Sequence, residues 1–522
     1  MITTGTILHR GNAVTADRAW SPSWKLFLLL VFLATWPALL NGQAFIFADT
    51  TAYIKGAAMG VEKATGFHSP WLDRRDTSAE TASSAAALAD FESSPERKGA
   101  LAGRSVYYGA FLLLSSMVGS LWVAVLLQGA LALLVIGIAA NVVGIGLPPS
   151  RSANVALVVL LLGGTSLSFY VSMLMPDLLA ALAVLSIATL MLGTTPRLWQ
   201  SGVLAGTIAF AALSHSSVIL IGGLLVATIF VLAGLLGHSS IGQLLRSAAW
   251  VVAALAVGVA GEVAFSVVMV KTVGEPPIRP PFLTARLLAD GPGTRWVHEH
   301  CQTSTYAVCK FASIAGKGTS DEFLWEKDPS IGAFTVADKA TRQALGREQW
   351  RFATDVTMAY PGDVFRSTFN NLFIQVTSLG LEGFNYDPPN YIDLRAKMPP
   401  AFLKALDNSL AAEGRFPVGA FEVLQWAVLS VSVAYLAYWL THQSIDGASR
   451  RLRRLCLWVG LGVLFNALIC GAMSTPHDRY QTRVVWLVVM LSVFAANVRW
   501  PAAMPRKIEE ERAAGQAPAV TG

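Results

Sequence analysis

Residues 119–143 read GSLWVAVLLQGALALLVIGIAANVV, a stretch of 25 residues without a charged side chain. The hydrocarbon core of a bilayer is about 30 Å thick, and a helix needs roughly 20 consecutive apolar residues to cross it. This stretch therefore predicts a membrane-spanning helix, and nine other mainly apolar stretches resemble it. The ten predicted spans are 24–41, 119–143, 153–170, 177–193, 201–215, 217–236, 247–270, 422–440, 455–473 and 482–499.

The composition of the whole chain also indicates a membrane protein. Of its 522 residues, 54% are hydrophobic and 14% are charged, whereas soluble domains carry roughly 25% charged residues. This excludes a soluble enzyme and a disordered chain, and four cysteines are too few for a secreted disulfide scaffold. The predicted fold class is an all-α polytopic membrane protein with about ten transmembrane helices. The net charge of +6 does not indicate a nucleic-acid partner, because the basic residues flank the apolar stretches and orient the protein in the membrane.

These flanking basic residues predict the orientation of the chain. Under the ten-span count they fall on one side, and the positive-inside rule makes that side cytoplasmic. The residues concerned are Arg10, Arg18, Lys25, Arg151, Arg197, Arg246, Arg450, Arg451, Arg453, Arg454, Arg499, Arg506 and Lys507. We therefore expect a multi-pass protein of the bacterial inner membrane with both termini in the cytoplasm. The first span also fits a signal peptide, because Lys25 precedes a short apolar run that ends in small residues.

The ten spans divide the chain into four parts. These are an N-terminal transmembrane module (1–270), an external domain (271–421), C-terminal transmembrane helices (422–500) and a cytoplasmic tail (501–522). The first outer loop covers 42–118, and its apolar segment 107–117 is too short to span, so it is expected at the membrane interface. The external part, of about 150 residues, is long enough for a small folded domain.

Two cysteines and a histidine pair stand out in this external domain. Cys301 and Cys309 are expected to form a disulfide in an oxidising compartment, and the alternative is two buried free thiols. His298 and His300 flank Glu299 in a pattern similar to a metal-ligand pair. Residues two apart on a helix face different directions, so we predict no metal site there.

Two acidic residues lie at the predicted outer edge of the membrane. Asp49 follows the first span in an apolar, aromatic setting that raises a carboxyl pKa and suits general-base catalysis, and the alternative is the N-cap of a following helix. Asp177 follows Pro176 at the outer end of the fourth span, where helix-start chemistry is the alternative. Two such carboxylates suit a shared substrate hydroxyl or a divalent cation.

The last outer loop, Ser474 to Arg483, reads STPHDRYQTR. Arg479 and Arg483 break the charge rule that the other short loops obey. A guanidinium is a planar fork of donors that suits phosphate oxygens, so a bound anion would explain the exception. The alternative is a salt bridge of Arg479 with Asp478 or with an acid of the large domain. His215, between the fifth and sixth spans, is interpreted as a polar turn residue.

These features resemble, in their order along the chain, the GT-C superfamily of polytopic glycosyltransferases, such as aminoarabinose transferases and protein mannosyltransferases. The resemblance covers roughly residues 24–270 and the final helix pair. It implies transfer of a sugar from a polyprenyl phosphate at the outer face of the membrane. By that resemblance Asp49 acts as base or orients the acceptor, Asp177 is the second outer acid, and Arg479 with Tyr480 lies near the lipid phosphate.

The resemblance also implies an arginine–aromatic element before the second span, matched here by Arg104 with Tyr107 and Tyr108. The family often has Asp-Glu in the first loop, whereas this chain has Asp49-Thr50, which departs from the metal-binding form of the mechanism. No metal ligands are assigned. The candidates for binding substrate or lipid phosphate are Arg104, Tyr53, Tyr108, His477, Arg479, Tyr480 and Arg483.

The leading hypothesis is a glycosyltransferase of the cell envelope. Its expected partners are a polyprenyl-phosphate-linked sugar donor, a glycan, lipid or protein acceptor, and the lipid bilayer. An envelope polysaccharide ligase or polymerase also combines many spans with external arginines. A transporter or flippase would show paired broken helices and an internal repeat at mid-membrane, and no clear repeat is seen. An uncharacterised scaffold is the remaining alternative.

Overall fold

The computed structural model describes residues 23–73, 104–145, 152–236, 241–442 and 447–499. Within these ranges the chain is helical and forms no β-strand, apart from an isolated parallel bridge between Phe45 and Met173. The described residues contain six helices long and apolar enough to cross a membrane. The protein is therefore an all-α, multi-pass membrane protein. The predicted tail 501–522 lies outside the described residues.

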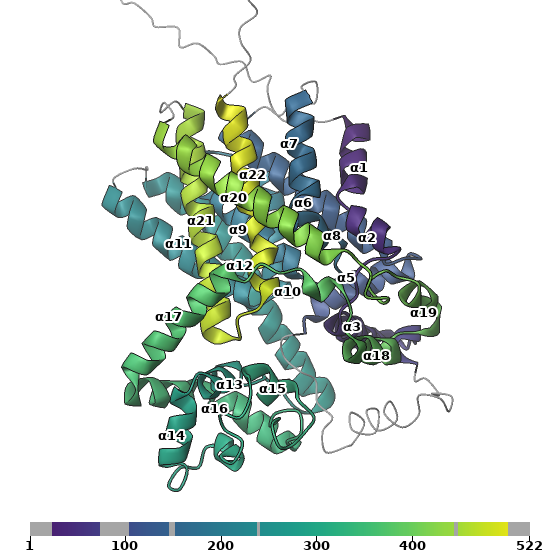
Figure 1. Ribbon diagram of the computed structural model, residues 1–522, viewed down its shortest axis with the longest axis vertical. Coiled ribbons are helices and arrows are strands. Elements are labelled where there is room, and N and C mark those ends of the chain that lie inside the picture. Colours follow the sequence, from purple (N-terminus) through teal and green to yellow (C-terminus); the bar gives the residue numbers. More distant parts are fainter. Residues whose placement is uncertain (1–22, 74–103, 146–151, 237–240, 443–446, 500–522) are drawn as a thin grey trace, which may run out of the picture.

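The main body is a bundle of long helices (Figure 1). The N-terminal end of α1 and the C-terminal end of α22 lie at the same end of this bundle. Its members are α1 (Trp24–Leu33), α2 (Trp36–Asn41), α6 (Trp122–Val143), α7 (Ser152–Gly163), α8 (Leu167–Ser172), α9 (Asp177–Leu190), α10 (Leu198–Ser214), α11 (Ser217–Leu236), α12 (Ile241–Val273), α20 (Val418–His442), α21 (Gly447–Met473) and α22 (Asp478–Arg499).

Two stretches predicted as single spans are interrupted. Residues 24–41 form α1 and α2, and Pro37 at the start of α2 cannot donate the hydrogen bond that would continue the first helix. Residues 153–170 likewise lie in two helices, α7 and α8. The two breaks contact each other, because the Trp36 indole Nε1 donates a hydrogen bond of 2.9 Å to the Leu162 carbonyl. Partners of this kind satisfy the backbone groups that a broken helix leaves free.

Helix α9 forms the centre of the bundle, since every one of its residues is buried. Its sequence, DLLAALAVLSIATL, is apolar on all sides after the first residue, which is the pattern of a helix surrounded by protein. Asp177 is the first residue of this helix, so the fold places one carboxylate at the end of the buried core.

Helices α3 (Ala48–Thr65) and α5 (Val106–Met117) form a pair beside the bundle. The pair is close because Gly109 of α5 has no side chain: a Cβ there would overlap the Tyr53 carbonyl of α3. The apolar segment 107–117 is thus a helix, and Leu112 and Leu113 are buried in the main core.

A second hydrophobic core, between Ile278 and Val364, forms what we call the small unit. It contains α13 (Phe282–Ala289), α14 (Pro292–His300), α15 (Ser320–Trp325) and α16 (Lys339–Ala359). The rest of the predicted 271–421 segment differs, because Leu379, Leu381, Phe384, Leu394 and Phe416 are buried in the main core instead. That part of the chain carries α18 (Pro388–Lys397) and α19 (Pro400–Asp407).

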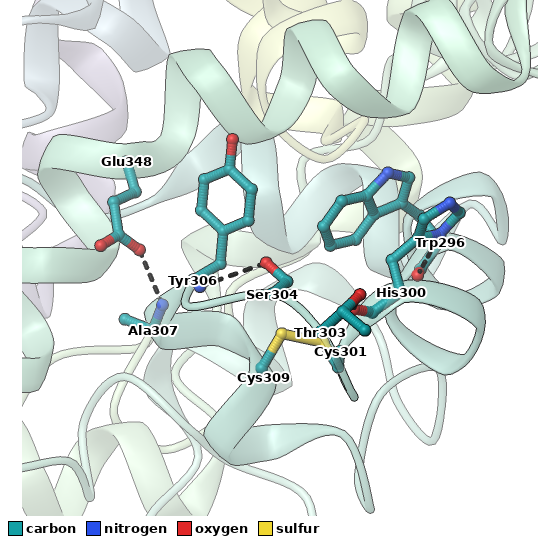
Figure 2. Close-up of a disulfide and its surroundings, with 9 residues drawn as sticks. All are labelled: Trp296, His300, Cys301, Thr303, Ser304, Tyr306, Ala307, Cys309 and Glu348. Atoms are coloured by element: carbon teal, nitrogen blue, oxygen red, sulfur yellow. Dashed lines mark hydrogen bonds between the residues drawn. A yellow bond between two sulfur atoms is a disulfide. The ribbon is translucent and has the colours of Figure 1, made fainter.

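A disulfide joins Cys301 and Cys309 in the small unit, with their Cα atoms 5.3 Å apart (Figure 2). Trp296 packs beside it, edge to face with Tyr306 at 5.5 Å and stacked on His300 at 4.9 Å. The disulfide closes the loop that follows α14 onto this aromatic core. Cys456 and Cys470 are free thiols.

Candidate functional site

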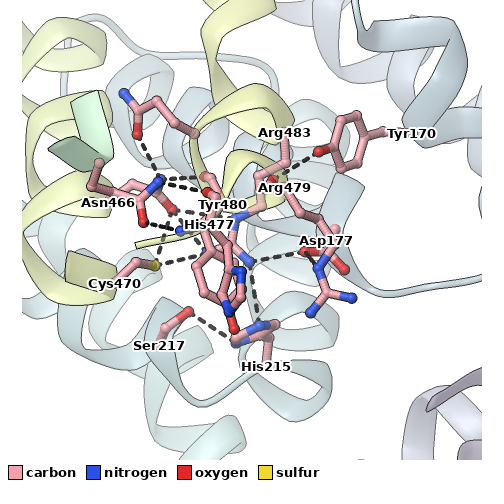
Figure 3. Close-up of polar contacts among 12 residues, drawn as sticks. Tyr170, Asp177, His215, Ser217, Asn466, Cys470, His477, Arg479, Tyr480 and Arg483 are labelled. Carbon is pink, nitrogen blue, oxygen red and sulfur yellow. Dashed lines mark hydrogen bonds and ion pairs between the residues drawn. The ribbon is translucent and has the colours of Figure 1, made fainter. Parts of the chain in front are cut away.

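The centre of the candidate site is the carboxylate of Asp177. Its Oδ1 lies 3.2 Å from Arg483 Nη1 and 3.7 Å from Arg479 Nε (Figure 3). The carboxylate comes from α9, and both guanidiniums come from the first turns of α22. The side chains of Asp177 and Arg483 are 2% and 0% exposed, so the pair is enclosed by protein. Burial of such a pair is tolerated only when its remaining hydrogen-bonding groups are also satisfied.

Polar side chains from α21 and from the break before α11 satisfy these remaining hydrogen-bonding groups. Arg483 donates to Asn466 Oδ1 from Nε at 3.3 Å and from Nη2 at 2.9 Å, and to the Cys470 sulfur. Its Nη1 also lies 3.3 Å from His215 Nε2, and Ser217 holds the other ring nitrogen at 2.9 Å. Arg483 is therefore fixed on all sides and positions its neighbours, and it is not accessible to a ligand in this structure.

Arg479 differs from Arg483 because its side chain is 32% exposed. The Tyr170 hydroxyl donates a 2.7 Å hydrogen bond to the Arg479 carbonyl and so fixes its backbone. Both guanidiniums lie over the Tyr480 ring, with Cζ atoms 5.5 Å and 5.3 Å from the ring centroid for Arg479 and Arg483. Arg479 is thus a rigidly mounted cation that has part of its surface open to a ligand.

A second ion pair, between Asp49 and Arg104, lies at the start of α3. Arg104 Nη2 is 2.5 Å from Asp49 Oδ1, and the two side chains are 26% and 30% exposed. Asp49 lies in the first turn of α3, and the N-cap of this helix is Phe47. The alternative prediction, that Asp49 is the N-cap, is therefore wrong. The Arg104 guanidinium also lies 5.3 Å from the ring centroid of Trp325, which belongs to the small unit.

Tyr53 lies within electrostatic range of both ion pairs. Burial raises the pKa of its phenol well above the usual range, and the carboxylates of Asp49 and Asp177 raise it further, while Arg104 and Arg479 lower it. All four charged groups therefore act on one hydroxyl. Its ring packs edge to face against Tyr108 at 5.6 Å. The structure thus brings the two predicted acids and the three predicted arginines, Arg104, Arg479 and Arg483, to one end of the bundle.

Three of the other predicted residues are held by protein partners. Tyr108 is 0% exposed and donates its hydroxyl to Gln128 Oε1 at 2.8 Å, so no ligand reaches it. His477 pairs with Asp321 of α15 at 2.8 Å, and its backbone exchanges two hydrogen bonds with Gln375. Tyr480 is enclosed between His477, at 5.3 Å, and the two arginines. Tyr108 and His477 thus organise the site.

Helix α15 of the small unit reaches both edges of the site. Its last residue, Trp325, covers Arg104, while Asp321 holds His477 and Ser320 contacts Thr475 by a hydrogen bond. The small unit is therefore in contact with the first outer loop and with the loop before α22. The other feature noted in this region, the His298–Glu299–His300 pattern, is used internally, with Glu299 bound to Arg295 at 2.9 Å.

Metal-binding geometry is not seen in the described part of the chain, where no three His, Cys, Asp or Glu side chains gather to hold an ion. Asp49 and Asp177 each engage arginine instead of sharing one centre. Comparisons with family models, curated proteins and solved structures find no match for this chain. Its function must therefore be argued from the site itself.

Sequence reasoning missed Asn466, Tyr170 and Gln128 as parts of the site. Gln128 donates to the carbonyls of Val171 and Met173 at 3.0 Å each, which holds the strand-like segment before Asp177 in place. A signal existed for Asn466 and Gln128, because each is an amide inside a predicted span, where polar side chains are costly unless they are bonded. Tyr170 carries no such signal.

Proposed function

We propose that this protein is an integral membrane glycosyltransferase that takes its sugar from a polyprenyl-phosphate-linked donor. The observation that carries the proposal is the proximity of the partly exposed Asp49–Arg104 pair to the partly exposed Arg479 guanidinium, which pairs with buried Asp177. The two groups are linked where the hydroxyl of Thr50, next to Asp49, donates to the Leu174 carbonyl, three residues before Asp177, at 2.9 Å. A sugar transfer from a lipid phosphate needs both kinds of group: a carboxylate to accept a proton and cations to stabilise the leaving phosphate.

The proposed chemistry uses the accessible side chains. Asp49 accepts the proton of an acceptor hydroxyl, whose oxygen forms the new bond to the anomeric carbon. The bond from that carbon to the phosphate oxygen breaks, and the lipid phosphate leaves with the electron pair. Arg479, with Arg104 once Asp49 engages the acceptor, stabilises the charge that develops on this phosphate. Asp177 pairs with Arg479, and Arg483 in turn fixes the Asp177 carboxylate.

The proposal includes ten spans in a bacterial inner membrane, with both termini cytoplasmic. Beyond the six long helices, the remaining four spans would be α1 with α2, α7 with α8, α9, and α10. Helix α9 has 14 residues and is entirely buried, so neighbouring helices shield it from lipid. The small unit would then lie on the external face, next to the acceptor side of the site.

The test uses membranes containing the full chain, incubated with a panel of polyprenyl-phosphate sugars and cell-envelope acceptors. Mass spectrometry measures the release of polyprenyl phosphate. Asp49→Asn is expected to reduce release by about 10²–10⁴-fold, because a well-placed base contributes that much. Glu62→Gln, on the same helix and paired with His68, is the matched control and should release at the wild-type rate. Full release by Asp49→Asn, or no release with any donor, contradicts the proposal.

A further inference from the structure

Helix α17 (Pro361–Thr377) leads from the small unit back to the bundle (Figure 1). One of its faces packs on the end of α21: a Cβ on Gly471 would lie 2.9 Å from the Asn371 carbonyl oxygen. The side chains on that face are polar. Gln375 is 0% exposed and bonds to the backbone of His477, and Asn371 Nδ2 donates to Asp290 at 3.2 Å.

A different face of the same helix carries a stripe of aromatic side chains. Phe365, Phe369 and Phe373 are 74%, 63% and 66% exposed. Their spacing of four residues places them above one another on one side of the helix. Val376, two turns beyond Phe369, extends the stripe and is also exposed.

This arrangement is the reverse of a helix that faces water. In water, a surface helix turns its apolar residues toward the protein and its polar residues outward. In α17 the amides of Asn371 and Gln375 are buried, and the three phenylalanines are exposed on a different face. Transfer of a phenylalanine side chain out of water is favourable, so three exposed rings favour an apolar surrounding for this stripe.

The position of α17 identifies that surrounding. Helix α21 is one of the six helices suited to cross a membrane, and its outward residues Leu457 and Leu464 are exposed apolar side chains of the same kind. Since α17 packs on the last turns of α21, it lies where a span leaves the bilayer. An exposed arginine, Arg366, follows the first aromatic residue, and a groove of about 430 Å³ lined by Arg295, Asp363 and Arg366 opens beside it. Apolar residues flanked by arginine are typical of helices in the interface plane.

We propose that α17 is an interfacial helix whose stripe, Phe365, Phe369 and Phe373, inserts into the hydrocarbon edge of the leaflet on the side of the small unit. The helix thereby fixes the small unit, and with it Trp325 and Asp321, at a set height above the membrane surface. The proposal stands on the packing of α17 alone and is independent of the reaction assigned to the site.

The experiment is spin-label accessibility on the full chain in phospholipid nanodiscs. The free thiols Cys456 and Cys470 are first replaced by alanine, and Phe369→Cys is then labelled. Its label is expected to collide readily with oxygen, which concentrates in lipid, and poorly with a water-soluble nickel chelate. Arg347→Cys, an exposed position on neighbouring α16, is the matched control and should show the reverse preference.

Two results would overturn the proposal. Equal access of nickel to positions 369 and 347 would mean that the stripe faces water. Protection from both reagents, with a label-to-label distance between two chains, would mean that a second copy covers it. Phe365→Cys and Phe373→Cys carry the same expectation, so failure of one variant to fold leaves the test intact.

Discussion

The substitution Asp177→Asn tests whether the buried charge cluster holds the bundle together. The change keeps the shape of the side chain and removes its charge. Arg483, at 3.2 Å, and Arg479, at 3.7 Å, would then face each other without a carboxylate between them. We expect the variant to fold less stably than the wild-type protein.

The magnitude follows from burial. Removing one partner of a buried ion pair costs about 3–5 kcal/mol, because the other charge stays buried and unpaired. The side chains of Asp177 and Arg483 are 2% and 0% exposed, so that range applies to them. The Asp49–Arg104 pair is 30% and 26% exposed, and a solvent-screened pair contributes about 0–1 kcal/mol. Asp177→Asn should therefore cost several times more stability than Asp49→Asn.

The assay is unfolding of purified protein in mixed micelles, with sodium dodecyl sulfate as the denaturant and circular dichroism as the readout. Asp49→Asn is the matched control, since the same chemical change is made in a more exposed pair. The double variant Asp177→Asn with Arg483→Gln should lose less than the sum of the two single variants, because the residues share one interaction. Equal stability of Asp177→Asn and Asp49→Asn would refute the reasoning.

Three further outcomes can be measured in the same protein. Gly109→Ala should cost about 1–3 kcal/mol of unfolding free energy, because the added Cβ overlaps a backbone carbonyl of α3. Gly56→Ala, which adds a Cβ in open space, is the control and should be neutral or stabilising. Equal effects of the two substitutions would contradict this packing. Cys301→Ser should destabilise the small unit by about 2–3 kcal/mol, because the disulfide no longer closes the loop. Limited proteolysis should then cleave the small unit faster. An unchanged cleavage rate would contradict a stabilising role of the disulfide. A hydrogen bond to the Glu62 carboxylate raises the pKa of His68, so His68 stabilises the fold fully below about pH 6.5 and this contribution is lost as the pH rises through the raised pKa. His68→Gln should therefore lower the thermal midpoint at pH 5.5 and have no effect at pH 9, and a pH-independent difference would contradict the assignment.

The all-α membrane class was predictable because it depends on local properties, namely length, apolarity and the absence of charge. The breaks within two of the predicted spans were not predictable. Residues 24–41 stay apolar across the break between α1 and α2, and Pro37 was the only local signal. A backbone group at that break is satisfied from elsewhere in the chain, because the Ala38 amide donates to the Ser172 hydroxyl at 3.3 Å, and no window along the sequence reveals such a partner.

The sequence predicted which residues belong to the site better than it predicted how they pair. Asp177, Arg479 and Arg483 stood out because ionisable groups beside a membrane are costly to place. Their pairing was not predicted: the salt bridge considered for Arg479 named Asp478 or an acid of the large domain, and the structure provides Asp177. Charge alone also gave no way to separate a buried, positioning arginine from an accessible one, because that depends on packing by Asn466 from another helix.

The bridge between Phe45 and Met173 has a consequence for how the protein is made. The Phe45 amide donates to the Ser172 carbonyl and its own carbonyl accepts from the Leu174 amide, at 3.0 Å each, and the next amide, of Ile46, donates to the Tyr386 hydroxyl. Ribosomes add roughly 5–20 residues per second, so a nascent chain holds residue 45 for several seconds before its first partner exists. Completion of this junction then awaits the emergence of residue 386. The first helices of this protein are therefore made well before the junction that holds them, and the junction is completed in the order in which residues 172 and 386 emerge.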